Sequence, residues 1–239
     1  MEITFLKKFC EVGNLKALLD IEQLPPSMQP FIQQLKSYYD PIPFTPVTNH
    51  RRYDDSLDDQ LYHNLIHKIN DKFPLYGNVW ITSTDYSAKE VTDRSNYTPV
   101  TSRASFLKHH SIRSEVYSTF HVSQNNSIVR LKDLSKATYG RIDSIFRHAR
   151  IRPDDEIYKD VFFAIKPLKA VPPITSNPFR QLADYEMQVS LQMFHPETHA
   201  MVFHESEILS HCAWIKFKPG EISHDISFET IAVVLLDRN

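Results

Sequence analysis

Histidines supply the first candidates for chemistry in this sequence. His63 and His67 are four residues apart, the spacing at which one helix can offer two zinc ligands. A looser group lies near the C-terminus and comprises His195, His199, His204 and the pair His211 and Cys212. The H-E-x-x-H motif is absent, because Asn64-Leu65-Ile66 separates the first two histidines. We therefore expect no metal site, and a histidine-dependent metallohydrolase is the alternative hypothesis.

Other catalytic signatures are also missing. The chain of 239 residues has only 4 Gly and contains no G-x-G-x-x-G, G-x-x-x-x-G-K-[ST] or G-x-S-x-G motif. Cys212 follows His211 directly, and neighbouring residues of a strand face opposite sides, so we expect a buried cysteine rather than a catalytic dyad. The sequence predicts no catalytic residue, no cofactor and no small-molecule substrate.

A basic central block is the strongest indication of a binding function. Residues 94–152 hold eleven Lys/Arg and three acids, a local net charge of +8 in a chain of formal net charge −2. Such a block can meet phosphate groups or an acidic partner if its side chains share one face, and is ordinary solvated surface if they do not. The candidate binding residues are Arg103, Lys108, Arg113, Arg130, Lys132, Arg141, Arg147 and Arg150. Aromatic side chains near cations can stack on bases, and the candidate aromatic contacts are Tyr139, Phe162 and Trp214.

The first 75 residues read as a helical segment. Apolar residues recur at helical spacing around Phe5 and Phe9, again from Leu15 to Leu19, and over residues 27–39. A fourth helix is predicted to begin near Ser56, because its apolar residues recur every fourth position, at Leu57, Leu61, Leu65, Ile69 and Phe73.

After Pro74 the pattern changes to short β-rich runs. Strands are predicted at 79–82, 116–122, 127–131, 139–148, 161–168, 201–203, 213–217 and 230–236, and residues 83–101 as an exposed connection. Many short strands without long intervening helices favour an antiparallel barrel or sandwich. The expected fold is α+β, with a helical segment over residues 1–75 and an antiparallel β-barrel over 76–239, in which Ile142, Ile145, Phe163 and Ile165 share the core.

Two stretches resemble a known family. ITFLKKFC at residues 3–10, followed by GNLKALL at 13–19, and YGRIDSIF at 139–146 are similar to segments beyond the catalytic core of fungal CACTA (En/Spm-like) transposases. The DNA-cutting carboxylates of such transposases lie upstream of the opening segment. The resemblance therefore implies a non-catalytic, transposase-derived module.

The β-rich part also resembles the bromo-adjacent homology (BAH) module, a chromatin reader. The resemblance rests on the strand at residues 139–146, on VFFAI at 161–165 and on VFHESEILSHC at 202–212. It implies a BAH-like barrel that contacts chromatin, DNA or another protein subunit through its basic face. A decaying transposon remnant without a selected function is a further alternative.

The sequence also bears on location. The N-terminus lacks the long apolar stretch of a signal peptide, and no run of apolar residues is long enough to span a membrane. Two cysteines are too few for a disulfide framework. We expect a nuclear or cytoplasmic protein without a membrane partner.

Overall fold

The computed structural model describes residues 53–113, 115–132, 138–172, 178–179, 182 and 189–236. Residues Arg51 to Asn239 form one compact unit. The three helices expected before residue 40 lie outside the described residues. No helix within the described ranges is long and apolar enough to cross a membrane.

Helix α3 (Asp59–Lys72) confirms the helix predicted from the four-residue apolar spacing. The Asp58 side chain accepts a hydrogen bond from the Leu61 amide at 2.8 Å, which caps the first turn. Leu61, Leu65 and Ile69 are buried, so the apolar stripe faces the protein interior as expected.

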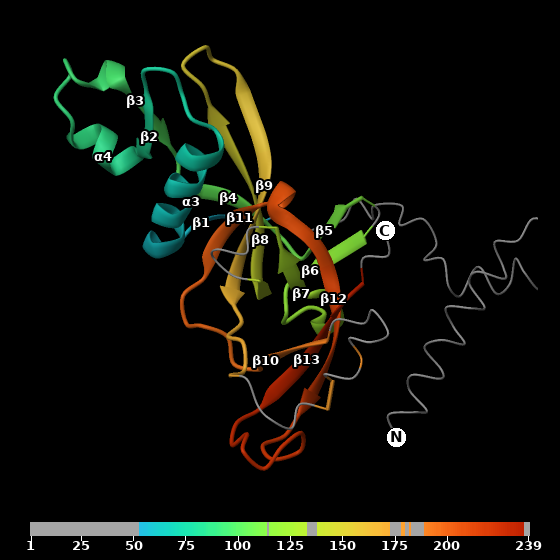
Figure 1. Cartoon of the computed structure of the whole chain (residues 1–239). Helices are drawn as coiled ribbons and strands as arrows, with labels where there is room; N and C mark the ends of the chain where they lie inside the picture. Colours follow the sequence, from blue (N-terminus) through green and yellow to red (C-terminus); the bar gives the residue numbers. More distant parts are fainter. Residues whose placement is uncertain are drawn as a thin grey trace, which may run out of the picture. The chain divides into compact units, whose positions relative to one another are not determined.

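The expected α+β fold with a helical segment over residues 1–75 is wrong, because most of the described chain is β-structure and residues Tyr53–Ser56 of that segment form a strand (Figure 1). Eight strands overlap predicted ones, although β6 ends earlier and β9 and β12 begin earlier than predicted: β2 (Val79–Thr82), β6 (Glu115–Ser118), β7 (Ile128–Leu131), β8 (Tyr139–Ile151), β9 (Ile157–Pro167), β11 (Met201–His204), β12 (Ile208–Phe217) and β13 (Thr230–Leu235). Five were not predicted: β1 (Tyr53–Ser56), β3 (Tyr97–Val100), β4 (Arg103–Leu107), β5 (His109–Ile112) and β10 (Val189–Met193).

The segment expected to be an exposed connection is more ordered than predicted. It contains the short helix α4 (Ser83–Ala88), a 3-10 turn η2 (Arg94–Asn96) and strand β3, which pairs in parallel with β2. Val100 at the end of β3 is buried. The polar composition of this segment does not indicate a strand. Its extended conformation is fixed by pairing with β2, a contact that the local sequence does not specify.

The predicted barrel is wrong: within the described residues the antiparallel sheets are open. The largest sheet runs in the order β1-β4-β8-β7-β12-β13-β10, and β9 pairs with both β8 and β11. The long strand β8 has β9 along one side and both β4 and β7 along the other. The described strands at the two ends of this order, β1 and β10, do not pair with each other. Strand propensity does not specify these long-range pairings, which explains why a barrel was expected.

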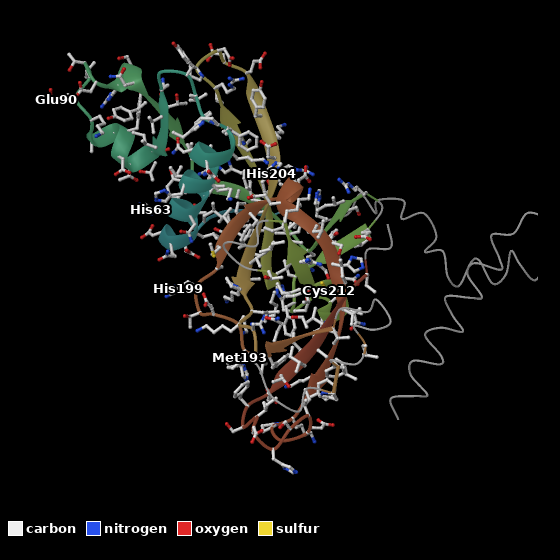
Figure 2. The ribbon with its side chains drawn as sticks, viewed as in Figure 1. His63, Glu90, Met193, His199, His204 and Cys212 are labelled. Atoms are coloured by element: carbon white, nitrogen blue, oxygen red, sulfur yellow. The ribbon has the colours of Figure 1, made fainter. Side chains whose placement is uncertain are left out.

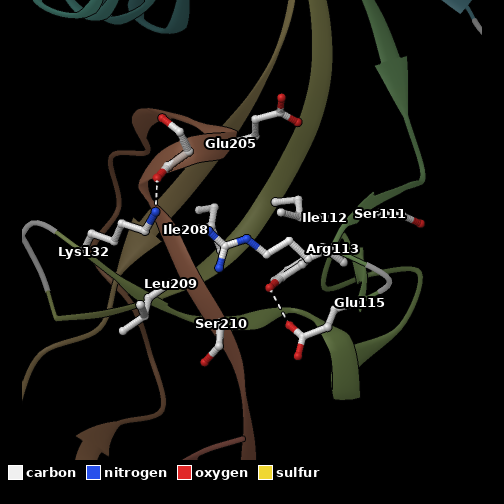
Figure 3. Close-up of a pocket in the computed structure, with 11 residues that line it drawn as sticks. Ser111, Ile112, Arg113, Glu115, Lys132, Glu205, Ile208, Leu209 and Ser210 are labelled. Carbon is white, nitrogen blue, oxygen red and sulfur yellow. Dashed lines mark hydrogen bonds between the residues drawn. The ribbon is translucent and has the colours of Figure 1, made fainter. Parts of the chain in front are cut away.

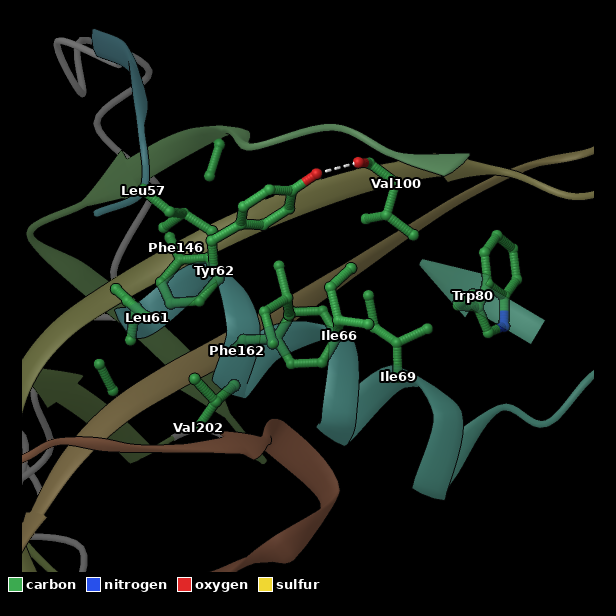
Figure 4. Close-up of a cluster of buried hydrophobic side chains, with 13 residues drawn as sticks. Leu57, Leu61, Tyr62, Ile66, Ile69, Trp80, Val100, Phe146, Phe162 and Val202 are labelled. Atoms are coloured by element: carbon green, nitrogen blue, oxygen red, sulfur yellow. Dashed lines mark hydrogen bonds between the residues drawn. The ribbon is translucent and has the colours of Figure 1, made fainter. Parts of the chain in front are cut away.

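Two cores lie on opposite faces of the β8–β9 pair. Ile142, Ile145, Phe163 and Ile165 share one core, as predicted. A β-bulge between Ile142 and Ser144 shifts the alternation, so that Ile142 and Ile145 face the same side. On the other face, Phe146 and Phe162 pack with α3, and Figure 4 shows these rings beside the helix side chains. We call the first the Ile145 face and the second the Phe146 face.

Beyond the last β4 pairing, β8 and β9 continue as a two-stranded ribbon over residues 148–151 and 157–160. Its Phe146 face is fixed by Arg150, whose Nη1 lies 2.5 Å from Asp160 Oδ2 and whose guanidinium stacks 4.1 Å from the Phe73 ring centroid. Arg150 is 3% exposed. The ribbon is therefore held in place by contacts on one face, and its other face is available to solvent.

Candidate partner-binding surface

The structure does not gather the eight candidate cations on one face. In the antiparallel register, Arg147 of β8 lies directly opposite Val161 of β9, which belongs to the Ile145 core. Arg150 lies directly opposite Tyr158, on the other face of the strands. Residues three apart in a regular strand face opposite sides, so these two arginines cannot act together. Arg150 is also buried and paired with Asp160, which makes it a structural residue.

Two of the candidates do share a face. Arg103 and Ser105 alternate along β4, and Ser105 is directly opposite Arg147 of β8. Directly opposite residues of an antiparallel pair point to the same side, so Arg103 and Arg147 lie on the Ile145 face. Lys159 lies on that face as well, because it is opposite Ala149, two residues from Arg147.

Exposed aliphatic side chains complete this surface at the end of the ribbon. Ile151 and Ile157 are directly opposite each other and are 54% and 63% exposed. We define the ribbon surface as Arg103, Arg147, Ala149, Ile151, Ile157 and Lys159. Its three cations form no hydrogen bond or ion pair with any described residue, whereas Lys68 and Lys166 elsewhere each pair with a carboxylate.

Two of the three carboxylates of the connecting turn, Asp154 and Glu156, make contacts away from the ribbon surface. The Tyr158 hydroxyl donates to Glu156 at 2.6 Å, and Tyr158 lies on the Phe146 face. Arg152 stacks on the Tyr158 ring and lies 4.0 Å from Asp154. Along the two strands the exposed isoleucine pair is therefore bordered by positive charge, and the exposed Asp155 lies in the turn beyond it.

The remaining candidate cations lie in other places. Lys108 is exposed after β4, and Arg113 and Lys132 line a pocket. Arg130 and Arg141 are half-buried, and the Arg141 guanidinium stacks 4.4 Å from the Phe120 ring centroid. Burial lowers the pKa of Arg141 below its usual range. These residues therefore do not extend the ribbon surface.

The three candidate aromatic contacts are not exposed together. Tyr139 and Phe162 are buried in separate cores, and Trp214 is half-buried with its indole Nε1 donating to the Gln124 carbonyl oxygen at 3.1 Å. Tyr139 and Phe162 therefore serve packing, since a buried ring cannot stack on a ligand.

The histidines and Cys212 do not assemble a metal or catalytic site among the described residues. Figure 2 shows His63, His199, His204 and Cys212 on separate elements, and no three His, Cys, Asp or Glu side chains of the described ranges lie close enough to hold a metal ion. Burial raises the pKa of the Cys212 thiol to about 12. A thiol with this pKa is not the reactive thiolate that catalysis requires.

Comparison with known proteins adds no assignment: no family model, curated protein or solved structure matches the chain. The resemblance to CACTA transposases and BAH modules therefore stays a prediction.

Sequence reasoning missed four of the six residues of the ribbon surface. Ile157 and Lys159 lie beyond the basic block, which ends at Arg152, and Ala149 and Ile151 carry no charge. The alternation Ile157-x-Lys159-x-Val161 contains the signal, since it puts an exposed isoleucine and a lysine on the face of a core valine.

Proposed function

We propose that this chain is a non-catalytic binding module and that its ribbon surface binds an acidic, amphipathic segment of a protein partner. The observation that carries the proposal is the exposed Ile151–Ile157 pair bordered by three cations that lack a partner among the described residues. An apolar centre with a charged border is the usual arrangement of a protein–protein interface. Acidic side chains of the partner would meet Arg103, Arg147 and Lys159.

The same features favour protein over nucleic acid. Nucleic-acid affinity depends mainly on the number of neutralised phosphates, and the part of the chain that the structure describes contributes three cations to the ribbon surface. Bases stack on aromatic rings, whereas the centre of the ribbon surface is aliphatic. Transposase descent, association with chromatin, and a nuclear or cytoplasmic location remain part of the proposal, supported by the sequence resemblance alone.

A peptide-display selection on the full chain tests this function. We expect peptides that combine Asp or Glu with apolar residues to be enriched on the wild-type protein at about 0.15 M salt, where weak long-range attraction is screened. The Ile151→Asp/Ile157→Asp variant should lose this enrichment. Equal enrichment on both proteins, or no preference for acidic peptides, contradicts the proposal.

A duplex DNA of arbitrary sequence is tested as a second ligand for the same two proteins. Binding to DNA that weakens with salt and requires Arg103 and Arg147 assigns the ribbon surface to nucleic acid instead.

A further inference from the structure

A pocket of about 560 Å³ (Figure 3) is lined by residues none of which belongs to the ribbon surface. It is bordered by the β5–β6 hairpin, by the 3-10 turn η5 (Glu205–Glu207) and by the start of β12. Ile112, Ile208 and Leu209 give it an aliphatic wall, and Arg113 and Lys132 bring two positive charges. The hairpin is itself anchored, since Tyr117 packs in the Ile145 core.

The backbone conformation at Arg113 is unfavourable for an arginine. It follows β5 in the turn of the hairpin and has φ 51°. Side chains other than those of Gly, Asn and Asp rarely adopt this left-handed conformation, and tight hairpin turns select glycine or asparagine there. An arginine at this position costs stability that the packing of the hairpin does not explain.

The Arg113 side chain extends into the pocket, as Figure 3 shows, and forms no hydrogen bond or ion pair with a described residue. Two carboxylates line the same pocket, and each contacts a group other than Arg113. Glu205 lies 2.7 Å from His110 Nε2, and Glu115 accepts a hydrogen bond from the Tyr117 hydroxyl at 2.8 Å. The guanidinium thus retains its donors for a ligand.

Lys132 supplies the second charge from a fixed position. Its Nζ donates to the Ser206 carbonyl oxygen at 2.6 Å, which ties the side chain to η5. This bond involves a neutral acceptor, so the ammonium charge is not neutralised by it. A guanidinium and an ammonium on one pocket are the groups that bind oxyanions in proteins.

We propose that this pocket binds an oxyanion, a carboxylate or phosphate carried on a short apolar stem, with Arg113 as its main ligand. The guanidinium donates to the oxyanion, Lys132 contributes charge, and the aliphatic wall covers the stem. The backbone strain at Arg113 is then explained as a cost of placing this side chain in the pocket. The proposal does not depend on the ribbon surface, because the two sets of residues do not overlap.

Titration of the full chain with butyrate and with inorganic phosphate, followed by backbone amide NMR shifts, tests the site. We expect saturable shifts at residues lining the pocket, with butyrate identifying a carboxylate site on an apolar stem and phosphate a phosphate site. Arg113→Gly should weaken binding about tenfold or more, because a charge-assisted bond is lost. Lys218→Gln, an exposed cation outside both the pocket and the ribbon surface, should leave the titration unchanged.

The stability of Arg113→Gly gives a second, independent test. Arg113→Gly should raise the denaturation midpoint, since glycine adopts positive φ without strain, and Arg113→Asn should do so to a smaller extent. Shifts that do not saturate, or that persist in Arg113→Gly, overturn the proposal. A lowered midpoint in both variants also overturns it, because Arg113 would then be retained for stability.

Discussion

Nη1 of Arg150 lies 2.5 Å from Oδ2 of Asp160, across the strands β8 and β9 and under the Phe73 ring. The side chain of Arg150 is 2% exposed and that of Asp160 is 22% exposed. Because the opposite face of the same ribbon carries the exposed isoleucines, this ion pair positions the surface that we assign to partner binding.

Removing one member of the pair should destabilise the fold. Arg150→Met removes the guanidinium from the Asp160 carboxylate and leaves it only His204 Nε2, at 3.5 Å from Oδ1, so we expect a loss of about 2 kcal/mol in the free energy of unfolding. Urea denaturation measures this loss. Arg152→Gln, two residues along and more exposed, is the control and should change stability by less than about 1 kcal/mol. Equal losses in the two variants would show that the pair does not anchor the ribbon.

Gly140 is expected to tolerate no side chain. A Cβ at this position would lie 2.2 Å from Ile165 Cγ2, and Ile165 is fully buried. Gly140→Ala should therefore cost about 1–3 kcal/mol through overpacking. Adding Ile165→Leu moves the branch away from Cβ and should restore part of the loss. A double variant that is no more stable than Gly140→Ala would contradict the steric explanation.

Acidification should destabilise the protein through His148. Burial lowers the pKa of His148 from its ordinary value of 6.5, while its hydrogen bond to the Thr101 carbonyl opposes that shift. His148 of the unfolded chain takes up a proton as the pH falls through about 6.5, and His148 of the folded chain does so only at lower pH. The free energy of unfolding therefore decreases as the pH is lowered through this range.

Unfolding free energies at several pH values between about 8 and 5 check this expectation. The decline should be smaller in His148→Gln, which retains a donor for Thr101 but does not titrate. An identical pH dependence in the two proteins would exclude His148 as its source.

The sequence predicts local structure well where one periodicity is strong. The four-residue spacing from Leu57 to Phe73 identifies α3, and the apolar runs at 139–148 and 161–165 identify β8 and β9. It does not predict that β4 and β7 share one side of β8, because strand pairing depends on contacts between distant segments. This is why an open sheet was mistaken for a barrel.

The candidate site was predictable only in part. Charge counting selects Arg103 and Arg147, but it equally selects Arg150, which pairs with Asp160 in the interior. Strand alternation separates Arg147 from Arg150, whereas the cross-strand register is needed to add Lys159. Ile151 and Ile157 resemble core residues in composition, and only the extension of the ribbon beyond β4 exposes them.

The central claim is that the ribbon surface binds an acidic, amphipathic protein segment. Its most direct test is the dissociation constant of the most enriched acidic peptide for the wild-type chain and for Ile151→Asp. We expect the variant to bind about tenfold or more weakly, since a buried aliphatic contact is replaced by a charge that repels the peptide. Ile215→Asp is the matched control, because Ile215 is 51% exposed on β12, outside the ribbon surface, and it should bind as the wild type does. Equal affinities for the wild type and Ile151→Asp, or equal losses at Ile151 and Ile215, would contradict the claim.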